Sequence, residues 1–195
     1  MRQAATTTIV RRRPTVESEP SHPLPLPEQI SIRTATADES ATIHSLILEY
    51  LAEGHLLPRE LEEITTHAHR FIVAVDDDDR LLGCAELAPL SPIVAEVRSL
   101  VVDRNARSLG VSRLMLDELV LRATAGGFEK LCAFTHDPSY FVHFGFSIVP
   151  HVWLPEKIVT DCRRCVHFRQ CGQYAVVRPL GQTRRSAIRL TALQG

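Results

Sequence analysis

The feature that most restricts the fold is a strand that ends in a tight turn and leads directly into a helix. The run 96-EVRSLVV-102 is rich in β-branched residues and is typical of a strand, and a helix is expected over 111–125. Arg107 to Ser112 form the turn between them. Backbone N–H groups of the turn and of the first helical residues point into one concavity, where the helix dipole favours negative charge. The pattern therefore predicts a phosphate pocket.

Three residues of this turn fit that interpretation. Gly110 lets a ligand approach the backbone, Ser112 keeps the helix start small, and Arg107 supplies a charge-assisted donor. The spacing matches neither the dinucleotide motif G-x-G-x-x-G nor the P-loop motif G-x-x-x-x-G-K-[ST]. A tight turn with a surface arginine would use the same residues, so the rest of the chain has to decide between the two interpretations.

Length and composition are those of an ordinary globular protein. The chain has 195 residues, 45% of them hydrophobic and 23% charged, which favours one domain with a sizeable core. The formal charge of −1 gives no bulk field to hold nucleic acid or an anionic membrane. No stretch approaches the roughly 18 to 20 uncharged apolar residues of a membrane span. We therefore expect a cytoplasmic protein whose partners are small molecules.

The proline pattern gives the domain boundaries. An Arg triplet and closely spaced prolines make residues 1–28 a flexible tail, although an organelle transit segment stays open as an alternative. The ordered domain is expected over 29–180, followed by a second tail over 181–195.

Hydrophobic periodicity predicts the elements of that domain. The capping-box pattern Thr36-x-x-Glu39 opens a first helix, and Pro58 is expected to open a second. The acidic run Asp76 to Asp79 is interpreted as a solvated hairpin turn, which is favoured over a cation site. The order predicts an α+β fold, with a mixed, mostly antiparallel sheet and helices on both faces. The expected strands begin at Ile30 and continue with 71–75, 81–87, 96–102, 131–135 and 174–177; the first helix stops near Gly54, and a short aromatic segment ends in 144–146.

The turn resembles the pyrophosphate loop of the GCN5-related N-acetyltransferase family, which has the form [QR]-x-x-G-x-[GA]. Serine replaces the usual last residue here. The resemblance implies acetyl-CoA as co-substrate and no resident metal. It also implies that the strand before the loop pairs with the pantetheine arm. The implied cofactor-binding residues are Leu100, Val101, Val102, Arg107, Ser108, Leu109, Gly110, Val111 and Ser112.

A narrower resemblance covers about residues 30–178. The segments 55-HLLPRELEE-63, 94-VAEVRSLVV-102, 143-HFGF-146 and 154-LPEKIVTDCRRCVHFRQC-171 are similar to short bacterial amino-acid N-acetyltransferases of the N-acetylglutamate synthase type, which lack an amino-acid kinase domain. This resemblance implies a free amino acid as acceptor, with L-glutamate and the first step of arginine biosynthesis as the expectation. A homodimer stays open, as does another small amine as acceptor. So does a non-catalytic acetyl-CoA-binding regulatory module.

Acetyl transfer to an amine needs a route for the ammonium proton and donors for the developing oxyanion. Glu96 is the candidate base, directly or through water, and related synthases resemble it in having Glu at this place. Strand alternation puts Glu96 and Arg98 on one face together with Leu100 and Val102. The alternative is a structural ion pair between Glu96 and Arg98. An oxyanion donor would come from a backbone N–H near Leu100 or Val101.

The general acid that many acetyltransferases use is a tyrosine four residues before the glycine of the last aromatic motif. Phe141 stands at that place here, and Tyr140 is one residue away. Tyr140 is therefore the candidate acid, with a half-buried structural aromatic as the alternative.

Acceptor recognition requires donors for an α-carboxylate, which guanidinium groups bind in a bidentate manner. Arg59 and Arg98 are the candidates. An exposed helical arginine is the alternative for Arg59.

The cysteines leave a second question open. Cys162, Cys165, His167 and Cys171 offer four soft ligands, but the compressed second half favours reduced packing cysteines over a zinc site. Cys84 and Cys132 lie in apolar strands and are expected in the core.

Overall fold

The computed structural model describes residues 29–51 and 56–181. The tail expected over 1–28, the helix stop expected at Gly54 and nearly all of the tail expected over 181–195 lie outside these residues. Within them, no helix is long and apolar enough to cross a membrane.

The core of the fold is a sheet of seven strands in the order β1-β2-β3-β4-β5-β7-β6. Every neighbouring pair is antiparallel except β4 and β5, which run parallel. The predicted mixed, mostly antiparallel sheet of an α+β fold is therefore confirmed. The strands are β1 (Ser31–Thr34), β2 (Phe71–Val75), β3 (Leu81–Pro89), β4 (Val94–Val102), β5 (Lys130–Thr135), β6 (Ser147–Val149) and β7 (Tyr174–Pro179).

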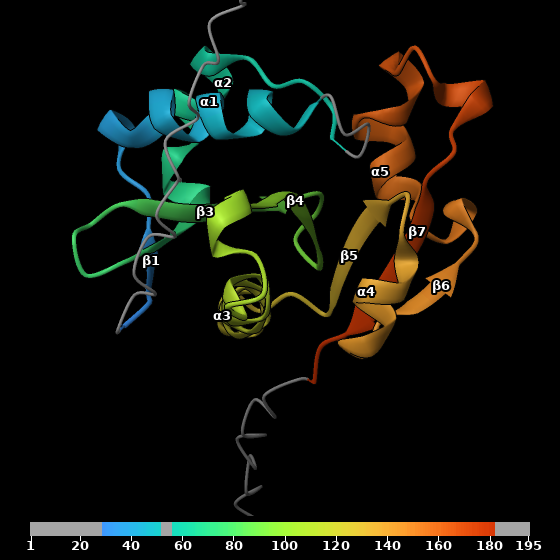
Figure 1. Cartoon of the computed structure of the whole chain (residues 1–195). Coiled ribbons are helices and arrows are strands. Elements are labelled where there is room, and N and C mark those ends of the chain that lie inside the picture. Colours follow the sequence, from blue (N-terminus) through green and yellow to red (C-terminus); the bar gives the residue numbers. More distant parts are fainter. Residues whose placement is uncertain (1–28, 52–55, 182–195) are drawn as a thin grey trace, which may run out of the picture.

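Helices cover both faces of this sheet, as expected. Figure 1 shows α1, α2 and α5 above the sheet and α3 below it. Alternate side chains of the strands contribute to hydrophobic clusters on both faces, one packed against α1 and α2 and another against α3 and α4. A smaller third cluster contains Val94, Cys132, Leu154 and Ala175. The helices are α1 (Ser40–Leu51), α2 (Leu61–Thr66), α3 (Val111–Ala125), α4 (Pro138–His143) and α5 (Pro155–Thr160).

Local signals account for several of these boundaries. The capping box is present, because the Thr36 backbone N–H donates to the Glu39 carboxylate at 2.7 Å just before α1 begins. The acidic run forms the β2–β3 hairpin turn, where Asp76 accepts from the backbone of Asp78 and Arg80 at 3.1 and 2.8 Å. The helix expected over 111–125 forms with those bounds.

One expectation about the elements is wrong, and two elements were missed. Pro58 does not open α2, which begins at Leu61 after an extended Glu60. Strand β6 and helix α5 were not predicted at all. None of the residues in either element is buried, so neither shows the alternation of buried and exposed positions on which the prediction relies.

Candidate active site

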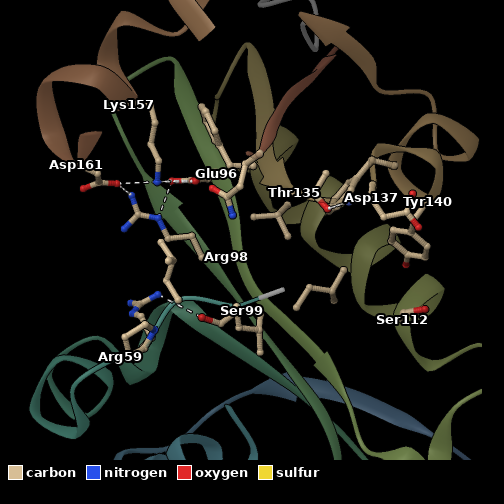
Figure 2. Close-up of a pocket in the computed structure, with 18 of the residues that line it drawn as sticks. Arg59, Glu96, Arg98, Ser99, Ser112, Thr135, Asp137, Tyr140, Lys157 and Asp161 are labelled. Atoms are coloured by element: carbon tan, nitrogen blue, oxygen red, sulfur yellow. Dashed lines mark hydrogen bonds and ion pairs between the residues drawn. The ribbon is translucent and has the colours of Figure 1, made fainter. Parts of the chain in front are cut away.

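The candidate site is a cavity of about 570 Å³ at the point where β4 and β5 separate. The two strands pair from Val94 opposite Lys130 to Val97 opposite Ala133, and their register ends there although β4 continues to Val102. Among residues 29–51 and 56–181, one edge of β4 therefore has no strand partner beyond Val97. Residues from β4, α3, α4, α5 and the segment before α2 line the cavity; the polar ones include Arg59, Glu96, Arg98, Ser112, Tyr140, Lys157 and Asp161 (Figure 2).

A β-bulge in β4 divides its side chains between the two faces of the sheet. Arg98 lies opposite Glu86 and Val101 opposite Cys84, so three steps along β4 match two along β3. Ser99 has a φ of 49°, which is uncommon for a residue other than glycine. The extra residue changes which side chains share a face.

The expectation that Glu96 and Arg98 share a face with Leu100 and Val102 is therefore wrong. Leu100 and Val102 pack with Val97 against the α3 side. Glu96 and Arg98 instead point to the opposite face, where they contact α5. Strict alternation fails because a bulge shifts every later side chain to the other face.

The turn predicted to bind phosphate has an open backbone at the start of α3. Gly110 precedes α3 with a φ of 78°, and a Cβ at this position would meet no heavy atom of the protein within 4 Å. Ser108 also has a positive φ, of 71°. The first N–H groups of α3 have no acceptor within the helix. The open backbone of the turn thus leaves room that a side chain would fill, which fits a pyrophosphate.

The side chains of the turn play different parts. The Arg107 guanidinium lies over the Tyr50 ring, 5.0 Å from its centroid. Ser112 faces the cavity, whereas Val111 is buried in the core, so only the backbone of Val111 is available to a ligand. Ser108 is exposed and Leu109 packs partly against the core. The structure brings Leu100, Val101, Val102, Arg107 and Ser112 together around a second, smaller hollow beside the main cavity.

Four charged side chains form a network on the opposite side of the cavity, which we call the charged cluster: Glu96, Arg98, Lys157 and Asp161. Arg98 Nε donates to Glu96 at 2.6 Å, and Lys157 Nζ lies 2.7 Å from Glu96 Oε1 and 2.8 Å from Asp161 Oδ2. Arg98 also pairs with Asp161. Figure 2 shows this cluster across the cavity from Ser112 and Tyr140. The predicted alternative for Glu96, an ion pair with Arg98, is thus present, and Lys157 extends it.

Electrostatics hold the two predicted arginines in their charged form. Burial by itself lowers the pKa of Arg98, but Glu96 and Asp161 more than offset this and the pKa is raised. Burial acts on the pKa of Arg59 in the same way, and Glu86 and Glu63 more than offset it. Both guanidinium groups are therefore permanent cations.

Arg59 occupies a different setting from the one expected for an exposed helical arginine. It lies just before α2 and is largely buried, with one guanidinium nitrogen 2.8 Å from both Glu63 and Glu86. It also donates to the Ser99 hydroxyl at 3.3 Å, which places it beside the bulge. Two carboxylates face the single cation Arg59, whereas in the charged cluster two carboxylates face two cations, so Arg59 has less positive charge to offer a ligand.

Tyr140 and Phe141 both line the cavity but differ in burial and in polar groups. Phe141 is buried in the core and also touches the cavity, but it has no hydroxyl. Tyr140 presents a buried hydroxyl with no hydrogen-bond partner of good geometry among the described residues. Burial raises the pKa of the Tyr140 phenol, while the nearby Ser112 hydroxyl works in the opposite direction. The phenol therefore stays protonated at neutral pH.

None of the five cysteines forms a disulfide in the structure. Cys84 and Cys132 are buried, as expected, whereas Cys162 and Cys165 are half-buried and Cys171 is exposed. Over residues 29–51 and 56–181, no three His, Cys, Asp or Glu side chains are arranged to hold a metal ion.

Two functional candidates were missed from the sequence, Lys157 and Asp161. Both stand in the segment 154–171, whose resemblance was noted without a role for either residue. Their spacing of four is that of an ordinary surface ion pair on a helix, which hides their contacts with β4.

Comparison with known proteins identifies the family. Residues 40–146, more than half of the chain, match the model of the Acetyltransferase (GNAT) family. An uncharacterized N-acetyltransferase of Chlorobaculum tepidum is 28% identical over 149 residues, which are 76% of this chain and 96% of that protein. An amino-acid acetyltransferase of Neisseria meningitidis is 29% identical over 136 residues, or 69% of this chain and 31% of that protein.

A solved structure gives a similar result. N-acetylglutamate synthase from Neisseria gonorrhoeae, complexed with coenzyme A and N-acetyl-glutamate, superposes with a TM-score of 0.71 and 26% identity. The match covers 79% of this chain and 36% of the synthase, so the chain spans about a third of the length of these amino-acid acetyltransferases. With its fold, its turn and the family match in agreement, the chain belongs to the acetyltransferase (GNAT) family and uses acetyl-CoA as its co-substrate.

Proposed function

We propose that this N-acetyltransferase acetylates the α-amino group of a free amino acid, L-glutamate, in the first step of arginine biosynthesis. The observation that carries the proposal is the pair of cations, Arg98 and Lys157, on the side of the cavity away from the phosphate turn. The likeness to amino-acid acetyltransferases and to N-acetylglutamate synthase supports the same acceptor.

The chemistry of these cations favours a carboxylate ligand. Arg98 offers a planar fork of donors and Lys157 a compact ammonium, and both reach the cavity from a partly buried position. Charge pairs strengthen as water is excluded, so a carboxylate that enters the cavity would be held more firmly than at an open surface. A polyamine has no carboxylate with which to pair Arg98 and Lys157. We therefore expect amino acids to be preferred to polyamines, with glutamate preferred to glutamine.

The strand β4 would serve the reacting atoms through its backbone. Because its edge has no strand partner beyond Val97, its N–H and C=O groups are free to pair with the pantetheine arm. The backbone N–H groups near Leu100 and Val101, which follow the bulge, are our candidates for the oxyanion donor.

Glu96 remains our candidate for the base that accepts the ammonium proton, directly or through water. The Glu96 carboxylate already accepts hydrogen bonds from Arg98 Nε at 2.6 Å and from Lys157 Nζ at 2.9 Å, so both cations occupy the oxygen that a proton would reach. The base role therefore requires Arg98 or Lys157 to loosen its hold on Glu96 during turnover. If neither does, Glu96 is a positioning residue for the two cations.

Tyr140 is the proposed acid for the leaving thiolate. Tyr140 lines the cavity, its buried hydroxyl lies near Ser112, and its raised pKa keeps the proton available at neutral pH. With phenylalanine at the family's usual place, Tyr140 is the tyrosine positioned to take this role.

The test is thiol release from acetyl-CoA in the presence of a panel of acceptors. Glutamate should give the highest kcat/KM, followed by glutamine, with lysine, agmatine and spermidine far below. If agmatine or spermidine exceeds both amino acids, the acceptor assignment fails. Binding of acetyl-CoA without thiol release from any acceptor would favour the regulatory module instead.

A further inference from the structure

We infer that Asp161 holds the place of the substrate carboxylate when no substrate is bound, so that the protein carries its own competitor for the acceptor site. This inference rests on the proposed function, because it takes Arg98 and Lys157 as the cations that receive a carboxylate. The Asp161 carboxylate lies between these two cations and pairs with both. A substrate carboxylate would need the same two partners.

Exposure separates Asp161 from the other acid of the charged cluster. The Glu96 side chain is 3% exposed on the central strand β4, and it cannot leave without opening the core. The Asp161 side chain is 36% exposed, more than Lys157 at 14% or Arg98 at 22%. Asp161 is therefore the member of the cluster that can turn out into water.

The backbone that carries Asp161 is lightly anchored. Asp161 stands at the C-cap of α5, where its N–H donates to the Lys157 carbonyl at 3.0 Å. Neither α5 nor the two 3-10 turns that follow it, Cys162–Arg164 and Phe168–Gln170, contains a buried residue. Segments with few buried contacts open locally at low cost. Little packing would resist a movement of Asp161 away from the cations.

The charge of the cluster gives the exchange its driving force. With Asp161 in place, two cations face two carboxylates and the cluster is neutral. When Asp161 turns away, the cluster keeps one unmatched positive charge beside the cavity. A carboxylate of the substrate restores neutrality, whereas a neutral or cationic acceptor does not. The arrangement would therefore add selectivity for acidic acceptors. It would also weaken the apparent affinity for the substrate, because only molecules in which Asp161 has turned away can bind it.

The experiment removes the charge of the competitor without removing its shape. Asp161→Asn should lower the KM for glutamate about tenfold, equivalent to about 1.4 kcal/mol. The matched control is Asp79→Asn, which removes the same charge from the β2–β3 turn, where Asp79 pairs with Arg33. This control should leave KM unchanged.

A second readout does not depend on which amine is acetylated. Glutarate carries carboxylates but no amine, and its binding in the presence of coenzyme A can be measured by calorimetry. Asp161→Asn should bind glutarate about tenfold more tightly than the wild type, and Asp79→Asn should not. If the glutamate assignment fails while glutarate binding tightens, the inference about Asp161 stands without the proposed function.

The opposite result would overturn the inference. If Asp161 only orients Arg98 and Lys157 for the substrate, its loss should raise KM and weaken glutarate binding. Unchanged values would also refute it, and if the wild type acetylates glutamate at the same time, the proposed function survives. Asp161→Ser provides a second neutral variant in case the asparagine variant does not fold. Asp161→Glu keeps the competing charge and should show no tightening.

Discussion

Replacing Gly110 by aspartate should abolish cofactor binding while leaving the fold largely intact. A Cβ at this position meets no heavy atom of the protein within 4 Å, so the new side chain enters open space without a clash. The φ of 78° is left-handed, which costs a residue other than glycine about 1 to 2 kcal/mol. Aspartate at the N-cap recovers a few tenths of this by accepting from the first turn of α3. We expect a net loss of about 1 kcal/mol, or about 2 to 4 °C in Tm for a domain of this size.

The effect on the cofactor should be much larger. The new carboxylate would occupy the same N–H groups that a pyrophosphate needs, and it would repel the negative charge of the ligand. A hydrogen bond to a charged group contributes about 1.5 to 3 kcal/mol. Losing two of them therefore corresponds to about 3 to 6 kcal/mol, which is more than a hundredfold in affinity for coenzyme A. Isothermal calorimetry with coenzyme A measures this directly.

Gly127 provides a matched control at the other end of the same helix. It has a φ of 80° and, like Gly110, open space around a Cβ. Gly127→Asp introduces the same strain and the same charge just after the C-terminus of α3, where it should lower Tm but leave affinity for coenzyme A unchanged. Unchanged affinity in Gly110→Asp, or an equal loss in both variants, would refute the phosphate-turn reasoning.

Three further predictions concern Glu96, Arg98 and the two buried cysteines. Glu96→Gln should lower kcat more than cofactor affinity, and the loss should shrink as pH rises if Glu96 is the base; a loss that is equal at all pH values indicates a positioning role. Arg98→Ala should raise the KM for glutamate about ten- to a hundredfold and spare acetyl-CoA binding, whereas Arg80→Ala in the hairpin turn should change neither. Burial raises the pKa of Cys84 to about 12 from 9.0 and that of Cys132 still further, so both thiols should resist a disulfide reagent in the folded protein, while the three other cysteines react. Because folding raises these two pKa values, their contribution to stability is complete below pH 9 and should be lost as pH rises toward 12.

The parts of the fold that sequence reasoning recovered are those with strong local patterns. The helix over 111–125 has its bounds where a glycine precedes it and another follows it, and the hairpin over 71–87 is two apolar runs around an acidic turn. These signals are local, so they need no knowledge of the tertiary structure. Strand β6 has three residues and lies at the sheet edge, so its presence depends on pairing with β7 rather than on its own pattern.

The sequence pointed to only some of the residues that line the candidate site, for two different physical reasons. The phosphate turn is a contiguous stretch, so its residues could be identified together. The charged cluster joins residues 61 and 63 positions apart, and nothing in α5 distinguishes Lys157 and Asp161 from a solvated pair. The face predicted for the side chains of Leu100 and Val102 was wrong, because nothing in the sequence indicates the left-handed conformation of Ser99.

The bulge at Ser99 interrupts the alternation of side chains along β4, and it would allow this one strand to contact both the acceptor and the cofactor. Before Ser99, the polar residues Glu96 and Arg98 point toward α5 and its charges. After it, Leu100 and Val102 point toward the α3 side, where the phosphate turn lies. An unbroken strand would have placed all four side chains on one face, and the charged acceptor groups would then share that face with the apolar arm of the cofactor. In the proposed reaction the two ligands instead approach β4 from opposite faces and meet beside the bulge. Under this proposal the left-handed Ser99 separates acceptor recognition from cofactor binding, and Ser99→Gly, which relieves the strain, should change neither the KM for glutamate nor the affinity for coenzyme A.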